Sequence, residues 1–295
     1  MPSGLKEYTA RLAKLGSHYW PLIKSRQTGL LLLTGLTGYL STRCPVFHLD
    51  TVIALTISLF LTISGSTMIN MWYDRDIDAI MPRTCQRPLP SGRVRPRSVI
   101  LLGITLTLAG LLIAFWMDLL YGSIVLLGVV FDVVVYTAWL KRRTAWAIIL
   151  GGISGGMPGL AGRALGLGFV DWVGIALALG ILFWIPTHIM TISIKYEDEY
   201  RKARIPTFPS TYGLTCTHRV IASANIFATL ALAAVAFGVG MSWGFFRLII
   251  ILSASLLALA LAGVIRPSQK RNFQLFKFAS VYLTIVMVLV SFAAL

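Results

Sequence analysis

Four oxygen-bearing side chains follow directly on an apolar stretch that is long enough to cross a bilayer. Asn70, Asp74 and Asp78 recur at every fourth residue, and Asp76 lies between the last two. A helix has 3.6 residues per turn, so this spacing stacks Asn70, Asp74 and Asp78 on one face, while Asp76 points away. Carboxylate and amide oxygens are the ligands of hard divalent cations such as Mg²⁺. The spacing therefore predicts a cation site at the end of a membrane helix, with a solvated acidic helix end as the alternative.

A second acidic cluster, Glu197-Asp198-Glu199, follows another long apolar stretch. Three consecutive carboxylates cannot share one helix face, because each residue advances about 100° around the axis. We take Asp198 as the candidate ligand for the metal or for a water bridging to it, with Glu197 or Glu199 assisting. The alternative is a charged helix end whose acids are balanced by neighbouring bases.

Basic residues near the two acidic clusters could bind an anionic partner of the cation. Guanidinium groups bind phosphate through two parallel hydrogen bonds, and lysine acts as a point charge. Most of these bases must anchor the chain at the membrane surface, but Lys24 and Arg26 open a membrane segment, and Arg87 lies just beyond the first acidic cluster. The candidates for anion binding are Lys24, Arg26, Arg87, Lys141 and Lys195.

Two further polar residues fall inside predicted membrane segments. Asp132 lies nine residues before Lys141, and a buried acid at that depth needs a partner or a polar cavity. His188 follows Pro186 on the segment that leads to the second acidic cluster. A histidine on such a helix is either a hydrogen-bonded core group or a functional residue, and both interpretations stay open.

The composition is typical of a membrane protein built from helices. The chain has 295 residues, of which 57% are hydrophobic and 13% are charged, whereas soluble domains carry about 25% charged residues. Its apolar runs are long enough for membrane helices rather than barrel strands. We predict one all-α membrane domain over residues 1–295, with about nine transmembrane helices. The predicted segments are 22–42, 51–72, 99–117, 119–140, 144–166, 171–193, 219–240, 243–265 and 274–294.

The net charge of +15 is mainly a topology signal and does not indicate a nucleic-acid partner. Nearly all of the 26 Lys and Arg residues fall in the amino-terminal segment and in every second loop. The positive-inside rule places these parts in the cytoplasm, so nine spans leave the carboxyl terminus outside. We expect a multi-pass protein embedded in the lipid bilayer of the cell membrane. Residues 1–19 carry an apolar stripe among basic residues, which predicts an amphipathic helix on the membrane surface.

The two longest internal cytoplasmic loops are predicted at about 73–98 and 195–218. Each begins with a carboxylate cluster and continues with Arg and Pro. This arrangement suggests two four-helix halves, each presenting one acidic loop at the same membrane face, with a ninth helix appended.

The first acidic cluster and the residues after it resemble a signature of the UbiA superfamily of intramembrane prenyltransferases. The signature is the row Asn70-x-x-x-Asp74-x-x-x-Asp78, followed by Met81-Pro82-Arg83-Thr84 and Arg87-Pro88-Leu89-Pro90-Ser91-Gly92. The stretch from Tyr73 to Thr84 looks most like the protoheme IX farnesyltransferase (heme O synthase) branch. Three further stretches are similar to that branch: Tyr136-Thr137 with Leu140-Lys141-Arg142-Arg143-Thr144, Trp184-Ile185-Pro186-Thr187-His188, and Asp198-Glu199-Tyr200 with Ile205-Pro206 and Pro209. The chain departs from the branch at Thr187, Arg204 and Thr207, where Pro, Gly and Met are usual.

The resemblance implies Mg²⁺-dependent transfer of a farnesyl group from farnesyl diphosphate to a vinyl group of protoheme IX, which gives heme O. The implied metal ligands, whose three carboxylates are also the implied catalytic groups, are Asn70, Asp74, Asp78 and Asp198. The five basic candidates would bind the diphosphate, and His188 and Asp132 would face the acceptor. The alternative is a UbiA-type enzyme whose acceptor is an aromatic quinone precursor or a lipid alcohol. A cation-binding transporter is a remote alternative, because the acids cluster at one membrane face and not at the midplane.

Overall fold

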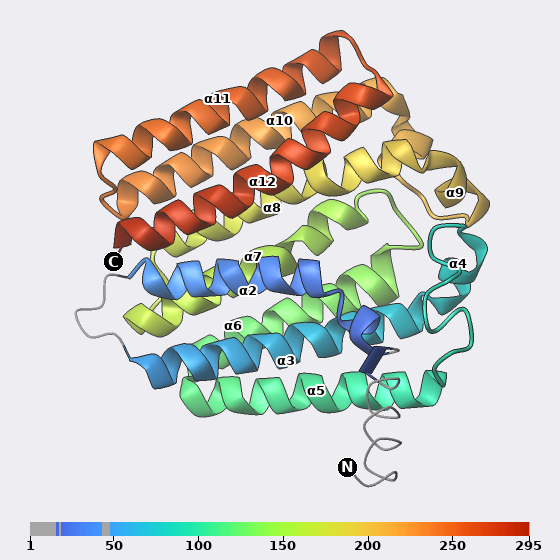
Figure 1. Cartoon of the computed structure of the whole chain (residues 1–295), viewed down its shortest axis with the longest axis horizontal. Helices are drawn as coiled ribbons and strands as arrows, with labels where there is room; N and C mark the ends of the chain where they lie inside the picture. The colour runs from blue at the N-terminus through green and yellow to red at the C-terminus, as the bar shows by residue number, and fades with distance from the viewer. Residues whose placement is uncertain (1–15, 18, 43–47, 295) are drawn as a thin grey trace, which may run out of the picture.

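The computed structural model describes residues 16–17, 19–42 and 48–294, and every regular element in these ranges is a helix (Figure 1). The predicted surface helix over residues 1–19 lies almost entirely outside the described residues. Most elements are α-helices, but η1 is a short 3₁₀-helix and η2 is a π-helix that continues α6. The elements are η1 (Trp20–Ile23), α2 (Ser25–Leu40), α3 (Leu49–Tyr73), α4 (Arg75–Ile80), α5 (Pro96–Met117), α6 (Leu119–Val129), η2 (Val130–Leu140), α7 (Ala147–Leu167), α8 (Trp172–Lys195), α9 (Glu197–Lys202), α10 (Phe208–Gly238), α11 (Trp243–Ile265) and α12 (Gln269–Ala294).

The long helices coincide with the nine predicted membrane segments, with α6 and η2 together forming one of them. Within the described residues, seven helices are long and apolar enough to cross a membrane. α2 and α7 are not among these seven. α2 has only 16 residues, and α7 carries several glycines, Pro158 and Arg163 in an otherwise apolar sequence. The all-helical prediction is therefore confirmed, and seven of the nine predicted segments are candidate membrane spans by length and composition.

The second acidic loop, predicted over 195–218, is largely helical. α9 occupies its start, and α10 begins at Phe208. Thr207 and Ser210 cap α10 reciprocally, because the side-chain hydroxyl of each accepts a hydrogen bond from the backbone N–H of the other. Gly213, at φ 79° and ψ 166°, then bends the chain before the apolar part of α10. The prediction began this helix at residue 219 because the turn before the bend is too polar to match a membrane segment.

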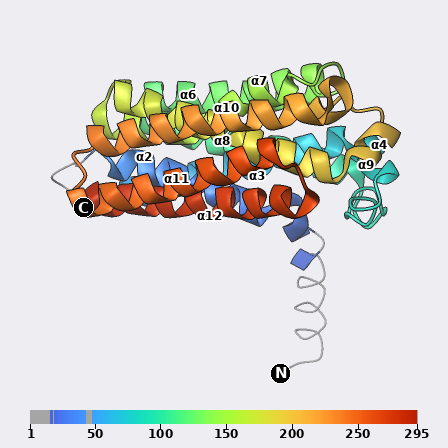
Figure 2. The ribbon, with the colours of Figure 1, turned by 90° about the horizontal axis from the view of Figure 1, so that it is seen from above.

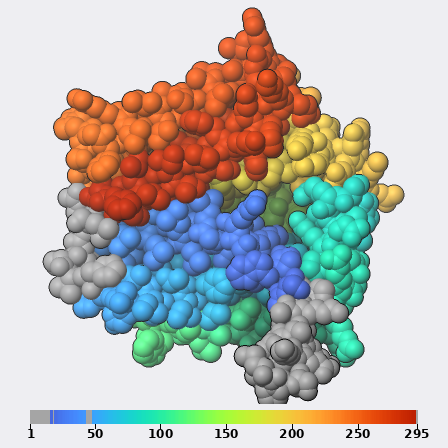
Figure 3. Space-filling model, in the orientation of Figure 1, coloured from blue at the N-terminus to red at the C-terminus, as the bar shows by residue number. Residues whose placement is uncertain are grey.

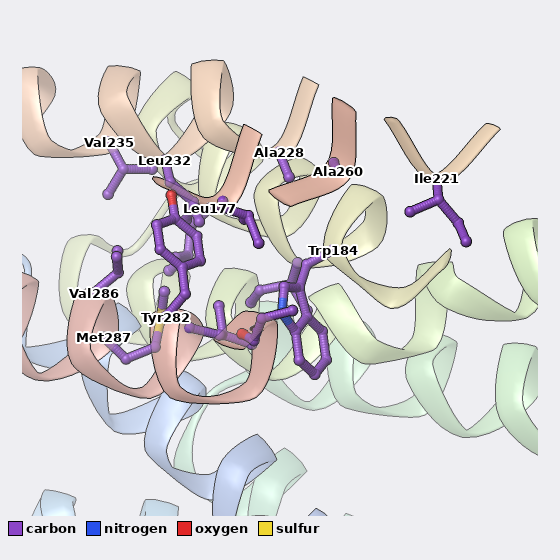
Figure 4. Packing of buried hydrophobic residues seen from close by; sticks show 14 of the residues in the cluster. Leu177, Trp184, Ile221, Ala228, Leu232, Val235, Ala260, Tyr282, Val286 and Met287 are labelled. Carbon is purple, nitrogen blue, oxygen red and sulfur yellow. Dashed lines mark hydrogen bonds between the residues drawn. The ribbon is translucent and has the colours of Figure 1, made fainter. Parts of the chain in front are cut away.

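The buried core contains two large hydrophobic clusters. One joins α8, α10, α11 and α12, where Trp184 donates a hydrogen bond to the carbonyl of Ala279 (2.7 Å) and Tyr282 packs beside Leu232 (Figure 4). The other joins α2, α3, α5, α6 and α7. α7 was predicted to open the second half, but its Ala161 and Ala164 pack into the core of the first. The two groups of helices therefore meet at α7, and also where α2 contacts α12.

α2 and α7 cross at very short range because both present glycine. A Cβ on Gly162 would lie 2.0 Å from the carbonyl oxygen of Gly35, and a Cβ on Gly38 would lie 2.1 Å from that of Gly159. Such close approach of two backbones is the usual role of small residues in membrane helices. It fixes the height of α2 relative to α7, and therefore the position of Lys24 at the start of α2.

Both acidic loops lie at the same end of the bundle, which we call the acidic end (Figures 1 and 2). A small apolar cluster holds the loops together, with Ile77 and Met81 from the first loop packed against Ala203 and Ile205 from the second. The carboxyl terminus lies at the opposite end (Figure 1). The expected meeting of the two acidic loops at one face is thus observed.

Candidate active site

We call Asn70, Asp74 and Asp78 the acidic row. They lie on one continuous run of helical hydrogen bonds at the acidic end. Asp74 lies between α3 and α4, and the backbone hydrogen bonds continue through it. Its N–H donates to the carbonyl of Asn70 (3.0 Å), and the N–H of Asp78 donates to the carbonyl of Asp74 (2.8 Å). All three residues are buried, at 9% exposure or less. The predicted stacking of Asn70, Asp74 and Asp78 on one face is therefore confirmed.

Asp76 points away from this row, as the sequence predicts. Its side chain is 60% exposed and accepts two hydrogen bonds of 2.8 Å from the guanidinium of Arg142. The hydrogen bond from Arg142 holds the pKa of the Asp76 carboxyl below its ordinary value. Arg142 also donates to the carbonyl of Tyr73 (2.9 Å), so this surface pair fastens the loop after η2 to the junction of α3 and α4.

A cavity of about 200 Å³ lies against the acidic row. Each carboxylate of the row already has a basic partner there: Lys141 contacts Asp74, and Arg87 donates to both oxygens of Asp78 (3.0 and 2.8 Å). The other oxygen of Asp74, Oδ1, is buried and has no hydrogen-bond partner. A buried carboxylate oxygen without a partner is costly unless a ligand satisfies it. The polar residues of the lining are Lys24, Asn70, Asp74, Asp78, Arg83, Arg87, Tyr136, Lys141, Ser193, Tyr200 and Thr207.

Hydrogen bonding orients the amide of Asn70. The hydroxyl of Thr137 donates its single proton to the carbonyl of Asp132 (2.7 Å) and can therefore only accept from Asn70. The amide nitrogen of Asn70 donates to that hydroxyl (2.9 Å), so its oxygen is left for the cavity. The row thus offers one amide oxygen and two carboxylates.

This set of oxygens fits a hard divalent cation that completes its shell with phosphate and water, which is the usual situation for Mg²⁺. In the described part of the chain, no cluster of three or more His, Cys, Asp or Glu side chains could hold a metal by itself. The unpartnered Oδ1 of Asp74 and the oriented amide of Asn70 are the observations that support the fit.

The π-helix η2 places Lys141 opposite the row. In an α-helix, residues nine positions apart lie on opposite faces. A π-helix has about 4.4 residues per turn, so nine positions are close to two full turns. Asp132 and Lys141 consequently share one face and line the same larger cavity, with Tyr136 between them. The wider helix is what brings Lys141 to Asp74.

Lys24 reaches the cavity from the start of α2. Its backbone is left-handed, at φ 45° and ψ 58°, between η1 and α2. A residue with a Cβ adopts this region at a cost of about 1–2 kcal/mol, and such strain is concentrated at functional sites. Lys24 lines both this cavity and the larger one.

Two of the predicted residues lie elsewhere. Asp198 is on α9 with its side chain 77% exposed, pairs with Arg201 and lines neither cavity. Lys195 is also outside both linings, with its ammonium over the rings of Tyr196 and Phe273. The structure therefore does not bring Asp198 or Lys195 to the acidic row.

The second acidic loop approaches the site through other residues. Tyr200 lines the small cavity, and its hydroxyl accepts a hydrogen bond from Arg83 (2.9 Å). Glu199 lies 3.6 Å from the same guanidinium. Arg83 therefore links the two acidic loops at the edge of the cavity.

A larger cavity of about 850 Å³ adjoins the small one inside the bundle and shares Lys24, Asn70, Tyr136 and Lys141 with it. Its walls are mainly apolar and come from α2, α3, α6, η2, α7, α8 and α12. Asp132 and His188, both predicted from the sequence, line it, and so does Arg26. Arg26 does not line the small cavity.

His188 is held between two aromatic rings. It stacks on Trp184 at 4.8 Å and lies 4.6 Å from Phe276, measured between ring centroids. Its Nδ1 is 3.2 Å from the hydroxyl of Ser280. The imidazole is therefore both packed and exposed to the cavity, which combines the two interpretations that the sequence leaves open.

Four residues of the site were not selected from the sequence, although each lies in a stretch that carries the resemblance. Arg83 and Tyr200 belong to the two loop motifs, and Tyr136 and Thr137 belong to the stretch before Lys141. Tyrosine and threonine are common in membrane helices, so their types alone carry no signal. The usable signal was their position one or two turns from a charged residue that was selected.

Comparison with known proteins gives consistent matches. The UbiA prenyltransferase family matches residues 31–283. A protoheme IX farnesyltransferase of Archaeoglobus fulgidus is 40% identical over 267 residues, which are 89% of this chain and 92% of the relative. The enzyme of the same name from Aeropyrum pernix is 36% identical over 274 residues, 91% and 88% of the two chains.

Solved structures share the fold at low identity. A structure of digeranylgeranylglyceryl phosphate synthase has a TM-score of 0.79 at 18% identity, covering 96% of this chain and 99% of the other. A UbiA homolog from Archaeoglobus fulgidus bound to DMAPP and Mg²⁺ has a TM-score of 0.67 at 17% identity, covering 93% and 99%. At these identities, the solved structures show the common fold alone.

Proposed function

Because the chain belongs to the UbiA prenyltransferase family, we propose that it transfers a farnesyl group from farnesyl diphosphate to a vinyl group of protoheme IX, giving heme O. The observation that carries the proposal is the pair of adjoining cavities, one small and charged and one large and mainly apolar. The relatives named protoheme IX farnesyltransferase, which match most of the chain, support this acceptor.

The diphosphate belongs in the small cavity. Asn70, Asp74 and Asp78 would hold Mg²⁺, which supplies charge stabilisation to the departing diphosphate. Without a donor, Lys141 neutralises Asp74 and Arg87 neutralises Asp78. Both bases lie within reach of an anion bound beside these carboxylates. Arg87, with its planar guanidinium, can bind phosphate through two hydrogen bonds. We propose that both residues exchange their carboxylate partners for phosphate oxygens when the donor binds.

The large cavity would hold the farnesyl tail and the acceptor. Its apolar walls exclude water from the allylic cation that forms as the carbon–oxygen bond to diphosphate breaks. The vinyl group donates its π electrons to that cation, which forms the new carbon–carbon bond. One water then adds to the resulting cation beside the porphyrin and loses a proton, so farnesyl diphosphate, protoheme and water give heme O and diphosphate. His188 and Asp132 face the acceptor in this arrangement.

The number of membrane spans, their orientation and the set of metal ligands are also proposals. We propose that α2 and α7 complete a set of nine spans in the cell membrane, with the acidic end and the amino terminus in the cytoplasm. The basic loops at the acidic end support this orientation through the positive-inside rule. The metal set that the geometry supports is Asn70, Asp74 and Asp78, without Asp198.

The test is an acceptor assay on the purified protein in lipid nanodiscs with Mg²⁺ and labelled farnesyl diphosphate. Heme and an aromatic quinone precursor are offered side by side, and the products are identified by mass. The proposal expects a heme product heavier by one farnesyl group plus one hydroxyl group. Prenylation of the quinone precursor with unchanged heme would overturn the proposed acceptor but leave the prenyltransferase assignment in place.

A further inference from the structure

The large cavity contains more positive charge than the donor requires. Among its described lining residues, Asp132 is the only acid, whereas four are basic: Lys24, Arg26, Lys141 and Lys277. Lys24 and Lys141 also line the small cavity, where the diphosphate is proposed to bind, but Arg26 and Lys277 do not. In the described part of the chain, no ion pair involves Arg26 or Lys277. These two cations are therefore available to a second anionic group.

Arg26 and Lys277 line the same cavity at a similar height of the bundle. They lie on α2 and α12, which meet further along, where the Thr37 hydroxyl contacts the Met287 carbonyl (3.2 Å) and the Ser291 hydroxyl (3.0 Å). Arg26 precedes Thr37 by eleven positions, and Lys277 precedes Met287 by ten, so each lies about 15 Å along its helix from this contact. Towards the acidic end the two helices diverge, and the surface is hollowed between red α12, blue α2 and the cyan segment after α3 (Figure 3).

The wall beside Lys277 is suited to a flat apolar molecule. Phe276 precedes Lys277 in α12 and packs on His188, which stacks on Trp184. One turn further along α12, Ser280 contacts the imidazole. The cavity thus combines an aromatic surface with two exposed cations at its edge.

We infer that Arg26 and Lys277 bind the carboxylates of the acceptor, a tetrapyrrole with two propionate groups. This rests on the proposed function and deepens it. The two propionates of protoheme IX lie on one edge of the macrocycle, and the two vinyl groups lie on the opposite half. Holding the propionates at the opening between α2 and α12 keeps their charge near water. It also directs the vinyl edge into the cavity, where the farnesyl group lies. Arg26 accordingly serves the acceptor and not the diphosphate.

The inference is tested by titrating hemin, and separately its dimethyl ester, into the purified protein in nanodiscs and following the absorbance of the porphyrin. The double variant Arg26→Gln/Lys277→Gln is expected to bind hemin about tenfold more weakly than the parent, because two partly exposed charge-assisted contacts are lost. The ester lacks both negative charges, so it should bind the parent about as weakly as hemin binds the double variant. The double variant should not distinguish hemin from the ester. The KM for farnesyl diphosphate should not change.

Lys270→Gln is the matched control, since it removes an exposed lysine from the same end of α12 outside both cavities and should leave hemin binding unchanged. Equal hemin affinity in the parent and the double variant would overturn the inference, as would a raised KM for farnesyl diphosphate with unchanged hemin binding. In either case, continued formation of heme O would leave the proposed function intact. A parent that neither binds nor farnesylates hemin would overturn the proposed function itself.

Discussion

Thr137 is expected to control metal affinity without touching the metal. It is buried at 1% exposure and connects two structural elements: it accepts a hydrogen bond from the Asn70 amide (2.9 Å) and donates one to the Asp132 carbonyl (2.7 Å). Both bonds lie next to the acidic row. Thr137→Val keeps the shape of the side chain and removes both bonds. Thr137→Ser keeps the hydroxyl and removes one methyl group.

The magnitude follows from what the lost hydroxyl does. Without it, the Asn70 amide has no group that fixes which of its atoms faces the cavity, so the amide oxygen is presented to the metal only part of the time. Loss of a hydrogen bond that orients a metal ligand typically weakens metal affinity about 10- to 100-fold. The Asn70 amide, left buried without its acceptor, also costs about 1–3 kcal/mol of stability. We therefore expect at least a tenfold rise in the Mg²⁺ concentration that gives half-maximal activity in Thr137→Val.

The assay is prenyl transfer measured against Mg²⁺ concentration, with the thermal unfolding temperature recorded for each variant. Thr137→Val should recover most of the parental kcat at high Mg²⁺, because no catalytic group is lost, while Thr137→Ser should follow the parental curve. A parental Mg²⁺ dependence in Thr137→Val would show that the hydroxyl does not orient the Asn70 ligand. An equal shift in both variants would also contradict this role, since the effect would then come from packing and not from the hydroxyl.

Three further perturbations test the site and the fold. Asp74→Asn should lower kcat about 100-fold or more even at saturating Mg²⁺, because it removes charge where the leaving group is stabilised. Asp76→Asn, on the outer face, should change kcat less than about twofold. Equal losses in the two variants would contradict the assignment of the two faces. Chelation of divalent cations should abolish product formation, and added Mg²⁺ should restore it, so unchanged activity in a chelator would exclude a metal-dependent step. Gly162→Ala should lower the free energy of unfolding by about 2–3 kcal/mol, since the added Cβ would meet the carbonyl oxygen of Gly35 at 2.0 Å. Gly29→Ala is the control, because its Cβ meets no atom within 4 Å and should leave the free energy of unfolding unchanged. Equal thermal unfolding of the two variants would contradict the close packing of α2 on α7.

The acidic row was predictable because spacing alone determines it. α3 continues through Asp74 into α4 with its hydrogen bonds intact, so the fourfold spacing of Asn70, Asp74 and Asp78 became one face in space. The approximate helix positions were predictable for a similar reason, since each apolar segment has to satisfy its own backbone.

Residues whose position depends on an irregular backbone or on partners from other elements could not be placed from the sequence. The three consecutive acids of α9 give no indication of which one faces inwards, and in the structure Asp198 faces solvent while the neighbouring Tyr200 lines the cavity. The π-helix η2 is mainly apolar, as is the α-helix before it, and nothing in its composition indicates the wider helix. An α-helical register would have placed Lys141 on the wrong face. Arg26 opens a membrane segment as Lys24 does, but only Lys24 has the left-handed backbone and lines both cavities.

The most direct test of the proposed metal and diphosphate site is a structure of the protein with Mg²⁺ and farnesyl thiodiphosphate, a donor analogue that reacts slowly. We expect a metal ligated by Asn70, Asp74 and Asp78. Lys141 and Arg87 should have turned from their carboxylate partners to phosphate oxygens, and the farnesyl chain should lie in the large cavity. An analogue bound away from the acidic row, with the Lys141–Asp74 and Arg87–Asp78 pairs unchanged, would contradict the proposed site.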